Sequence, residues 1–336
     1  MISELSKYKI GSYEVLLDYH IDEGNYSTVY IGRCLDPDII FKYNINKSKI
    51  INNTEIKNIV AIKALTNKKN NLIINNKIIN NKIETEENTI MQFIKENPHD
   101  NIVTCYDIIN DIDTVYIIME YCEDGNLSNI IGKPLNEETI KHYIYQIVNG
   151  IKYMNENKIM HRDIKPKNLL LSNNKHTLKI CDFGLSKIKT DNNDNVICGS
   201  PLYMAPEVFN NKYNRYDNSI DIWSLGIVMY EMIYGKNPLS KITDFSKLKL
   251  FMINTDKIIL DSNINVSNEC IKLLELLLIK DSEKRITIKK LYNHTWILNR
   301  NKSNVLIDFD NNQENNELNN SQNINDDSAL LFKLDD

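Results

Sequence analysis

The sequence predicts an α+β fold in which strands and helices occupy different parts of the chain. The N-terminal third holds apolar, β-branched runs at residues 29–31 and 59–65, which are typical of sheet. The C-terminal part places apolar residues at intervals of three and four, which predicts helices over 137–155, 219–234 and 269–279. The 42% hydrophobic and 25% charged residues are ordinary for a chain with a buried core.

Two polar segments rich in Asn, Ile and Lys interrupt the strand-rich third. We expect the first, over about residues 43–57, to form a long hairpin excursion between two strands. The second, over residues 67–82, precedes an amphipathic helix that is expected to begin near Glu84. Composition assigns no function to either insert.

The most specific signal is the string HRDIKPKN at residues 161–168, because DFG follows at 182–184, fourteen residues after Asn168. These residue types supply a carboxylate that can take up a hydroxyl proton, with a cation beside it. They also supply an amide and a second carboxylate that can hold Mg²⁺. Positioning and charge neutralisation at a γ-phosphate require such a set. A lone DFG would be weak, since three-residue strings recur by chance.

Three further motifs stand in a matching order: VAIK at 60–63, APE at 205–207 and DIWSLG at 221–226. Together the five motifs resemble those of eukaryotic protein kinases, over about residues 13–298. The resemblance implies a bilobal protein-kinase fold. Its N-lobe, about residues 13–120, would be a small antiparallel β-sheet with one helix, and its C-lobe, about 121–298, would be larger and mostly helical. Residues 1–12 would form an N-terminal lead, and the Asn- and Asp-rich residues 299–336 a disordered tail.

The resemblance implies ATP-dependent transfer of a γ-phosphoryl group to a Ser or Thr hydroxyl of a protein substrate, with ATP and Mg²⁺ as cofactors. Asp163 is implied as the catalytic base, and Lys165 as the cation that neutralises charge on the transferring group. Asn168 and Asp182 are implied as the magnesium ligands. A lysine two residues after the catalytic Asp resembles the Ser/Thr class, and Leu185 after DFG favours serine over threonine.

Lys63 is implied to contact the α and β phosphates and to pair with a carboxylate on the helix that follows. We choose Glu87, because Ile90 and the apolar residues after it then face the core. Glu84 and Glu86 would be solvated charges. A surface lysine is the plain alternative, but an unpaired ammonium would be costly inside this apolar strand.

The resemblance also implies an apolar slot for the adenine base. Backbone groups of Glu120 and Cys122 are expected to bind the base, and Met119 to close the pocket behind it. The full set of implied cofactor-binding positions is Ile21, Gly24, Val29, Ala61, Lys63, Met119, Glu120, Cys122, Leu170 and Asp182.

The loop that covers the phosphates departs from the family pattern. Glycines there let backbone N–H groups approach phosphate without a Cβ in the way, and residues 21–29 (IDEGNYSTV) keep only the middle one, Gly24. We expect weaker ATP binding or slower turnover. The alternative function is therefore a catalytically weak pseudokinase that acts as a binding scaffold, although the other intact motifs favour the enzyme.

The activation segment lacks its usual modification site. Val196 stands where many relatives carry a phosphorylated Thr or Ser that binds the arginine of HRD, here Arg162. We hypothesise that the segment orders without phosphate at that position, using Asp191 or Asp194, with Thr190 as an alternative site.

Two features bear on the protein substrate. Lys167 stands where kinases that select basic residues upstream of the acceptor often have Glu, so we expect weak selection for Arg despite Glu231. Ile197, Pro201 and Met204 are expected to line an apolar pocket for the residue after the acceptor.

Other implied contacts are structural. Asp221 is expected to anchor the loop of His161, and Glu207 is expected to form an ion pair with Arg285. His161 and Phe183 are expected to pack internally rather than to carry protons. The strings CGSPLYMAPE at 198–207 and FSKLKLF at 245–251 look like those of the autophagy-initiating, ULK-like kinases.

Composition and charge exclude several other classes. No run approaches a membrane span and no secretory signal pattern opens the chain, so we expect a cytoplasmic protein. The net charge of −5 comes from residues 301–336, and the near-neutral remainder offers no basic stripe for a nucleic-acid partner. The six cysteines lack metal-ligand spacing and are expected to be buried free thiols. The oligomeric state stays open.

Overall fold

The computed structural model describes residues 6–23, 27–51, 54–66, 86–189, 197–209, 217–255, 257–260 and 264–299. The chain divides into two compact units, a first unit over Met1–Glu123 and a second unit over Asp124–Asp336. Strands dominate the described part of the first unit and helices that of the second, which confirms the expected α+β class.

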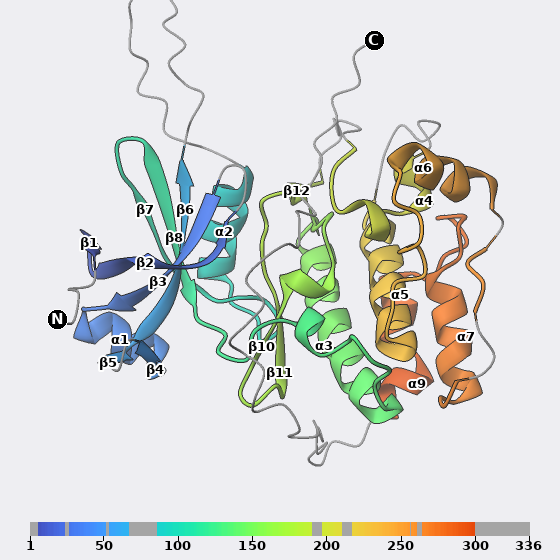
Figure 1. Cartoon of the computed structure of the whole chain (residues 1–336), viewed down its shortest axis with the longest axis horizontal. Helices are drawn as coiled ribbons and strands as arrows, with labels where there is room; N and C mark the ends of the chain where they lie inside the picture. Colours follow the sequence, from blue (N-terminus) through green and yellow to red (C-terminus); the bar gives the residue numbers. More distant parts are fainter. Residues whose placement is uncertain are drawn as a thin grey trace, which may run out of the picture. The chain divides into compact units, whose positions relative to one another are not determined.

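A six-stranded antiparallel sheet forms the body of the first unit, in the order β1-β2-β3-β6-β8-β7 (Figure 1). The predicted strand runs lie in β3 and β6. Lys7 pairs with Leu16, so β1 belongs to the sheet although it lies within the expected lead. The strands are β1 (Lys7–Ile10), β2 (Tyr13–Glu23), β3 (Ser27–Cys34), β6 (Ile59–Thr66), β7 (Cys105–Asn110) and β8 (Thr114–Glu120).

The first polar insert forms the expected hairpin, in which β4 (Ser48–Ile51) pairs antiparallel with β5 (Thr54–Lys57). A short helix that the sequence pattern did not predict, α1 (Pro37–Tyr43), precedes it. Asp36 caps this helix by accepting from the backbone N–H groups of its first turn. Isoleucines of the insert are buried against the sheet, so this Asn-rich segment still contains a few apolar residues that attach it to the core. The second insert, residues 67–82, lies outside the described residues.

Helix α2 (Glu86–Glu96) packs against β7 of the same unit. Ile90, Met91 and Ile94 are buried along one face, at the spacing of three and four that the sequence shows. The expected start at Glu84 lies outside the described residues.

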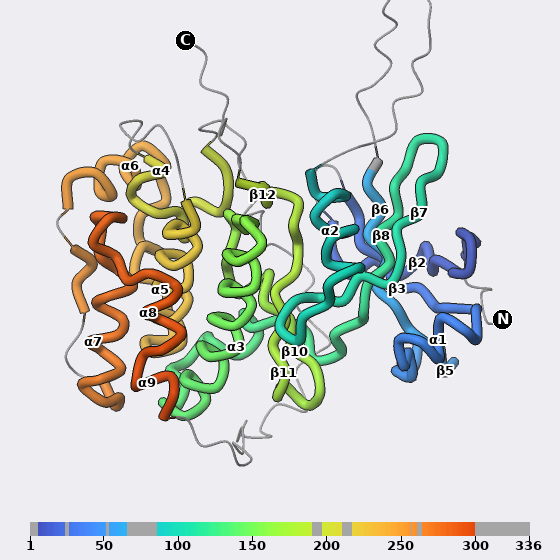
Figure 2. Tube along the Cα trace, turned by 180° about the vertical axis from the view of Figure 1, so that it is seen from behind, coloured from blue at the N-terminus to red at the C-terminus, as the bar shows by residue number. Residues whose placement is uncertain are grey.

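The second unit is built around long helices. The predicted helices are present as α3 (Glu137–Glu156), α5 (Ser219–Tyr234) and α7 (Asn268–Leu277), with ends within two residues of the prediction. These three run side by side, and the almost wholly buried α5 packs against both others (Figures 1 and 2). The shorter helices are α4 (Pro206–Phe209), α6 (Phe245–Asn254), α8 (Ile288–Tyr292), α9 (Thr295–Leu298) and the 3₁₀ turns η1 (Leu127–Asn129), η2 (Pro166–Asn168) and η3 (Pro201–Tyr203).

Two small antiparallel strand pairs complete the described second unit and flank the HRDIKPKN and DFG motifs. One is a hairpin of β10 (Leu169–Ser172) and β11 (Thr177–Ile180). In the other, β12 (Lys187–Ile188) pairs with β9 (Ile159–Met160).

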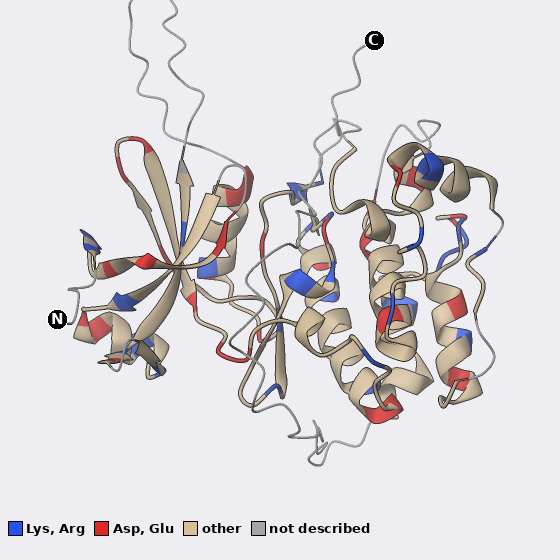
Figure 3. Ribbon diagram, viewed as in Figure 1, with Lys and Arg blue, Asp and Glu red and all other residues tan. Residues whose placement is uncertain are grey.

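Surface and thiol properties agree with the composition. Figure 3 shows Lys and Arg interspersed with Asp and Glu within each unit. None of the helices in the described ranges combines the length and the apolar character needed to cross a bilayer. All six cysteines are free, and five are buried. Burial raises the pKa of Cys105 to about 12, so its thiol is protonated and unreactive at neutral pH.

Candidate active site

A hairpin brings the two predicted metal ligands together in the second unit. Leu169 at the start of β10 pairs with Ile180 at the end of β11, and the N–H of Cys181 donates to the carbonyl of Asn168 at 3.0 Å. Asn168 and Asp182 therefore flank the open end of the same hairpin. Their separation along the chain reflects the length of this hairpin.

The side-chain contacts of Asn168 leave its amide oxygen as the atom suited to a cation. Its Nδ2 donates to the carbonyl of Asp163 at 2.9 Å and to Asp163 Oδ2 at 3.0 Å. Mg²⁺ takes oxygen ligands and is usually held by one or two carboxylates together with substrate phosphates. In the described ranges no three acidic, His or Cys side chains form a metal cluster by themselves. The pair Asn168 and Asp182 thus fits a magnesium ion that is shared with phosphate.

Asp163 lies at the centre of a compact polar cluster and is only 5% exposed. Its Oδ2 lies 3.0 Å from Lys165 Nζ, and its Oδ1 accepts from the N–H of Ser200 at 2.9 Å. Lys165 Nζ also donates to Ser200 Oγ at 2.7 Å. Together with Asn168, these donors fix the direction of the Asp163 carboxylate.

Ser200 is the site residue that the sequence analysis missed. It contributes a backbone N–H to Asp163 and a hydroxyl to Lys165. The available signal was Gly199 beside it. Gly199 has φ +109°, and a Cβ there would lie 2.5 Å from the carbonyl oxygen of Arg162. Only glycine lets the two segments approach so closely.

Asp221 anchors the loop of His161, as predicted. It is 1% exposed, and its carboxylate accepts from the N–H groups of His161 at 2.8 Å and Arg162 at 2.9 Å. Burial raises the pKa of Asp221, and the Arg162 charge together with the N–H groups of His161 and Arg162 opposes that rise. These bonds hold Arg162 at φ +67°, just before Asp163, the residue expected to act as the base.

His161 is an internal packing residue, which also confirms the prediction. The N–H of Asp163 points at His161 Nδ1 at 3.3 Å, so Nδ1 accepts and Nε2 carries the proton toward the carbonyl of Cys181, 3.0 Å away. The ring meets Phe183 edge-on, with centroids 5.2 Å apart. Both its nitrogens are used in holding the loop and the DFG segment together.

The hypothesis about the activation segment falls largely on residues outside the described ranges, namely Thr190, Asp191, Asp194 and Val196. The described contact of the Arg162 guanidinium is with Leu185, whose carbonyl accepts from Nε at 2.6 Å. Phosphate-free ordering of this segment stays a prediction.

In the first unit, Lys63 on β6 forms the predicted ion pair with Glu87 on α2. Lys63 Nζ lies 2.7 Å from Glu87 Oε1, and each side chain is 9% exposed. Glu86 is exposed, as expected, whereas Glu84 lies outside the described residues. The pair fixes the ammonium in a buried setting, where an isolated charge would be costly.

Four of the predicted nucleotide-binding positions share one face of the sheet. Val29 pairs with Lys63, and Ala61 pairs with Met119. Directly opposed residues in antiparallel strands lie on the same face, and so do residues two apart in one strand. Ile21 lies on β2 and is 47% exposed. Gly24 lies outside the described residues.

The end of β8 carries the residues expected to bind adenine. The N–H of Glu120 donates to the carbonyl of Thr104 at 3.0 Å. The backbone group of Glu120 that we expect to bind adenine is therefore its carbonyl. Its side chain also turns to Thr104, accepting from the N–H at 2.6 Å and the hydroxyl at 2.9 Å. Cys122, which follows the strand, is buried. Leu170 lies on β10 of the second unit and is half-buried.

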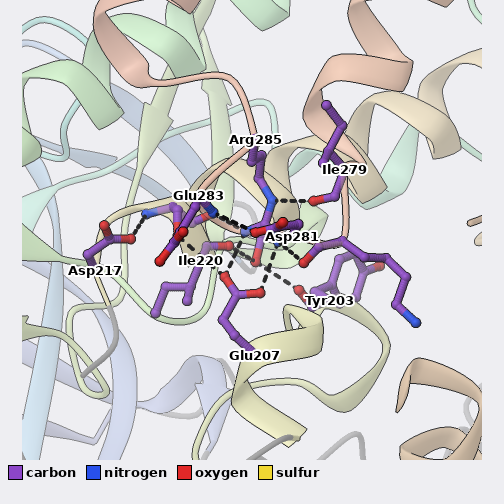
Figure 4. A network of polar contacts seen from close by, with 11 residues as sticks. Tyr203, Glu207, Asp217, Ile220, Ile279, Asp281, Glu283 and Arg285 are labelled. Carbon is purple, nitrogen blue, oxygen red and sulfur yellow. Dashed lines mark hydrogen bonds and ion pairs between the residues drawn. The ribbon is translucent and has the colours of Figure 1, made fainter. Parts of the chain in front are cut away.

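The predicted ion pair of Glu207 and Arg285 is present and buried (Figure 4). Two parallel bonds join the guanidinium to the carboxylate, at 2.7 and 2.9 Å. Arg285 also donates to the carbonyls of Ser219 at 2.8 Å and Ile279 at 2.9 Å. It therefore ties α4 to the start of α5 and to the segment after α7.

A pocket of about 280 Å³ opens beside the polar cluster around Asp163. It is lined in part by Lys165, Lys167, Lys236 and Glu231. Glu231 Oε1 accepts from the Tyr203 hydroxyl at 2.9 Å and from Asn237 Nδ2 at 2.6 Å. Burial raises the pKa of Glu231, which disfavours its anionic form.

Comparison with known proteins identifies the family. Residues 46–297, well over half of the chain, match the family model described as protein kinase domain. The chain belongs to the protein kinase family.

Its similarity extends to named members of that family. The chain is 36% identical over 304 residues to serine/threonine-protein kinase atg1 of Dictyostelium discoideum, covering 88% of this chain and 41% of that protein. It is 30% identical over 288 residues to serine/threonine-protein kinase ULK3 of Xenopus laevis, covering 84% and 55%. A putative serine/threonine-protein kinase of Acanthamoeba polyphaga mimivirus is 37% identical over 228 residues, covering 60% and 50%. The expected likeness to ULK-like kinases is thereby confirmed, and the chain spans about half the length of these relatives.

Proposed function

We propose that this protein transfers the γ-phosphoryl group of Mg-ATP to serine or threonine hydroxyls of protein substrates. The observation that carries the proposal is the cluster in which Asp163 is held by Lys165, Asn168 and the N–H of Ser200. Membership of the protein kinase family and the likeness to named Ser/Thr kinases support it.

The roles follow from the contacts. Asp163 accepts or orients the proton of the substrate hydroxyl, because its carboxylate is aimed by three donors and lies beside a cation. Lys165 places positive charge next to both Asp163 and Ser200, where charge develops on the transferring group. Asn168 and Asp182 would hold Mg²⁺, which when bound neutralises phosphate charge.

In the first unit, the residues that we propose to bind the nucleotide share one face of the sheet. Glu87 holds the Lys63 ammonium in place on the sheet face that also carries Val29, Ala61 and Met119. Lys63 then contacts the phosphates, and the small and apolar neighbours accept the flat base.

The direct test is transfer of radiolabelled phosphate from ATP to a generic protein substrate. We expect Asp182→Ala to lower transfer by roughly 10²-fold or more, whereas Asp113→Ala, at an exposed β7–β8 turn, should leave it unchanged. Equal background signal from wild type and Asp182→Ala would contradict the proposal and favour a binding scaffold. Analysis of the labelled amino acids tests the preference for serine.

The pocket beside the cluster supports weak selection for arginine upstream of the acceptor. Lys167 and Lys236 are exposed at its rim, while Glu231 is already bonded to Tyr203 and Asn237. Positive charge repels a substrate arginine and attracts an acidic side chain. On a peptide array, we expect Asp or Glu to be tolerated better than Arg there. Lys167→Glu should raise the rate with Arg-containing peptides, and a wild-type preference for Arg would oppose this substrate assignment.

A further inference from the structure

The first insert contacts the segment that presents backbone groups to the adenine. Lys47, which precedes β4, donates from Nζ to the carbonyl of Tyr121 at 2.9 Å. The same ammonium pairs with the carboxylate of Glu123. Lys49 on β4 reaches the Tyr121 hydroxyl at 2.7 Å and lies over its ring. The insert therefore contacts the residues on both sides of Cys122, namely Tyr121 and Glu123.

The insert that carries Lys47 is itself held in place by apolar packing and a backbone hydrogen bond. Ile51 and Ile56 of the insert are buried in a cluster that also includes Ile59, and Tyr121 packs against that cluster. The carbonyl of Lys47 accepts from the N–H of Ile59 at 3.1 Å, which joins the lysine backbone to the start of β6. The ammonium is thus built into the first unit at a defined distance from Tyr121.

A carbonyl that is held in place also fixes the N–H that follows it. The carbonyl of Tyr121 and the N–H of Cys122 belong to one planar, trans peptide unit, so they point in opposite directions. When Lys47 binds that carbonyl, it sets the direction of the Cys122 N–H. A cation on the oxygen also polarises the peptide and strengthens the N–H as a donor.

We propose that Lys47 is a positioning residue for the nucleotide base: it orients and polarises the Cys122 N–H that binds the ring acceptor N1 of adenine. The proposal rests on the proposed function, because it assumes that ATP occupies this site. It gives the Asn-rich insert a role at the base end of the nucleotide.

The test is a comparison of three ligands in binding calorimetry on the full chain. The ligands are Mg-ATP, an ATP analogue with C–H in place of ring nitrogen N1, and Mg-tripolyphosphate, which has no base. Lys47→Met should weaken Mg-ATP binding roughly 3- to 10-fold. It should leave the affinity for the other two ligands unchanged, because neither can accept from the Cys122 N–H.

Two further variants sharpen the result. Lys57→Met removes an exposed lysine of the same hairpin whose partner is Glu55, and it should bind all three ligands as wild type does. Lys47→Gln keeps a hydrogen-bond donor without the charge and should lie between wild type and Lys47→Met. In steady-state assays, Lys47→Met should raise the KM for ATP. Its kcat and its KM for the protein substrate should remain unchanged.

The proposal is overturned if Lys47→Met, with an unchanged melting temperature, binds Mg-ATP as tightly as wild type. It is also overturned if the variant loses affinity equally for ATP and its N1-lacking analogue. If Lys47→Met does not fold, equal ATP affinity of Lys47→Gln and wild type overturns it. A wild type that binds ATP with the expected ligand pattern but transfers no phosphate would refute the proposed function and leave this proposal standing.

Discussion

Gly199 shows how one missing side chain sets the geometry of the catalytic cluster. Its positive φ and its approach to the carbonyl of Arg162 deliver the N–H of Ser200 to Asp163. We expect Gly199→Ala to lower kcat by roughly tenfold or more, since the loop must shift and the Ser200 donor is displaced. It should also lower the melting temperature, whereas Gly132→Ala should not, because a Cβ at Gly132 meets no atom within 4 Å. Unchanged kcat in Gly199→Ala would contradict this account of the loop.

Glu231 provides a pH-dependent prediction. Burial raises its pKa above the ordinary 4.5, so the folded protein binds this proton more readily than the unfolded chain does. The stabilising contribution is therefore complete below pH 4.5 and is lost as pH rises through the folded-state pKa. Glu231→Gln keeps a carbonyl oxygen for Tyr203 and Asn237 without the ionisation. Relative to wild type, the variant should gain unfolding free energy at neutral pH and none in acid, as measured by urea denaturation at several pH values. A gain that grew toward low pH would have the wrong sign.

At the scale of elements, the buried ion pair holds α4, which has only four residues. Because Arg285 is buried with its carboxylate partner, Arg285→Met leaves Glu207 as an uncompensated buried charge. We expect this variant to lose about 3–5 kcal/mol of unfolding free energy. The neighbouring Lys284→Ala removes only an exposed pair with Asp281, which water screens, and should cost far less. Similar losses in urea denaturation for the two variants would argue against the structural role of the pair.

The elements also show which parts of the fold the sequence could predict. Helices α3 and α7 were recognisable because their apolar spacing is regular and because Asn136 and Ser267 cap them. Helix α1 was missed although Asp36 and Pro37 are start signals, because it has only seven residues and none of them is buried, so no core-facing apolar pattern repeats along it.

At the site, contacts between two side chains of known motifs could be predicted from the sequence. Contacts that depend on backbone N–H or carbonyl groups could not. Glu87 could be chosen from the helix face, and its pair with Lys63 is present. Ser200 was missed because half of its contribution is a backbone N–H, which every residue type except proline carries. The Lys47 contact with Tyr121 joins residues 74 positions apart, a distance at which no local spacing rule operates.

At the scale of the whole molecule, both units carry residues that we propose to act on Mg-ATP. The first unit supplies Lys63 with Glu87, and the second supplies Asp163, Asn168 and Asp182. If these groups act as one apparatus, their losses are not additive. We expect the double variant Lys63→Met, Asp182→Ala to transfer phosphate no more slowly than the worse single variant. If, in a single-turnover assay, the rate of the double variant were lowered by the product of the two single-variant factors, the two residues would contribute independently.

The most direct measurement separates nucleotide binding from phosphate transfer in Asp163→Asn. Asparagine keeps the size of the side chain but cannot accept a proton, and it leaves the magnesium ligands in place. For this variant we expect Mg-ATP affinity within about twofold of wild type and single-turnover transfer to protein that is lower by roughly 10²-fold or more. Transfer at the wild-type rate by Asp163→Asn would contradict the assignment of this residue as the base.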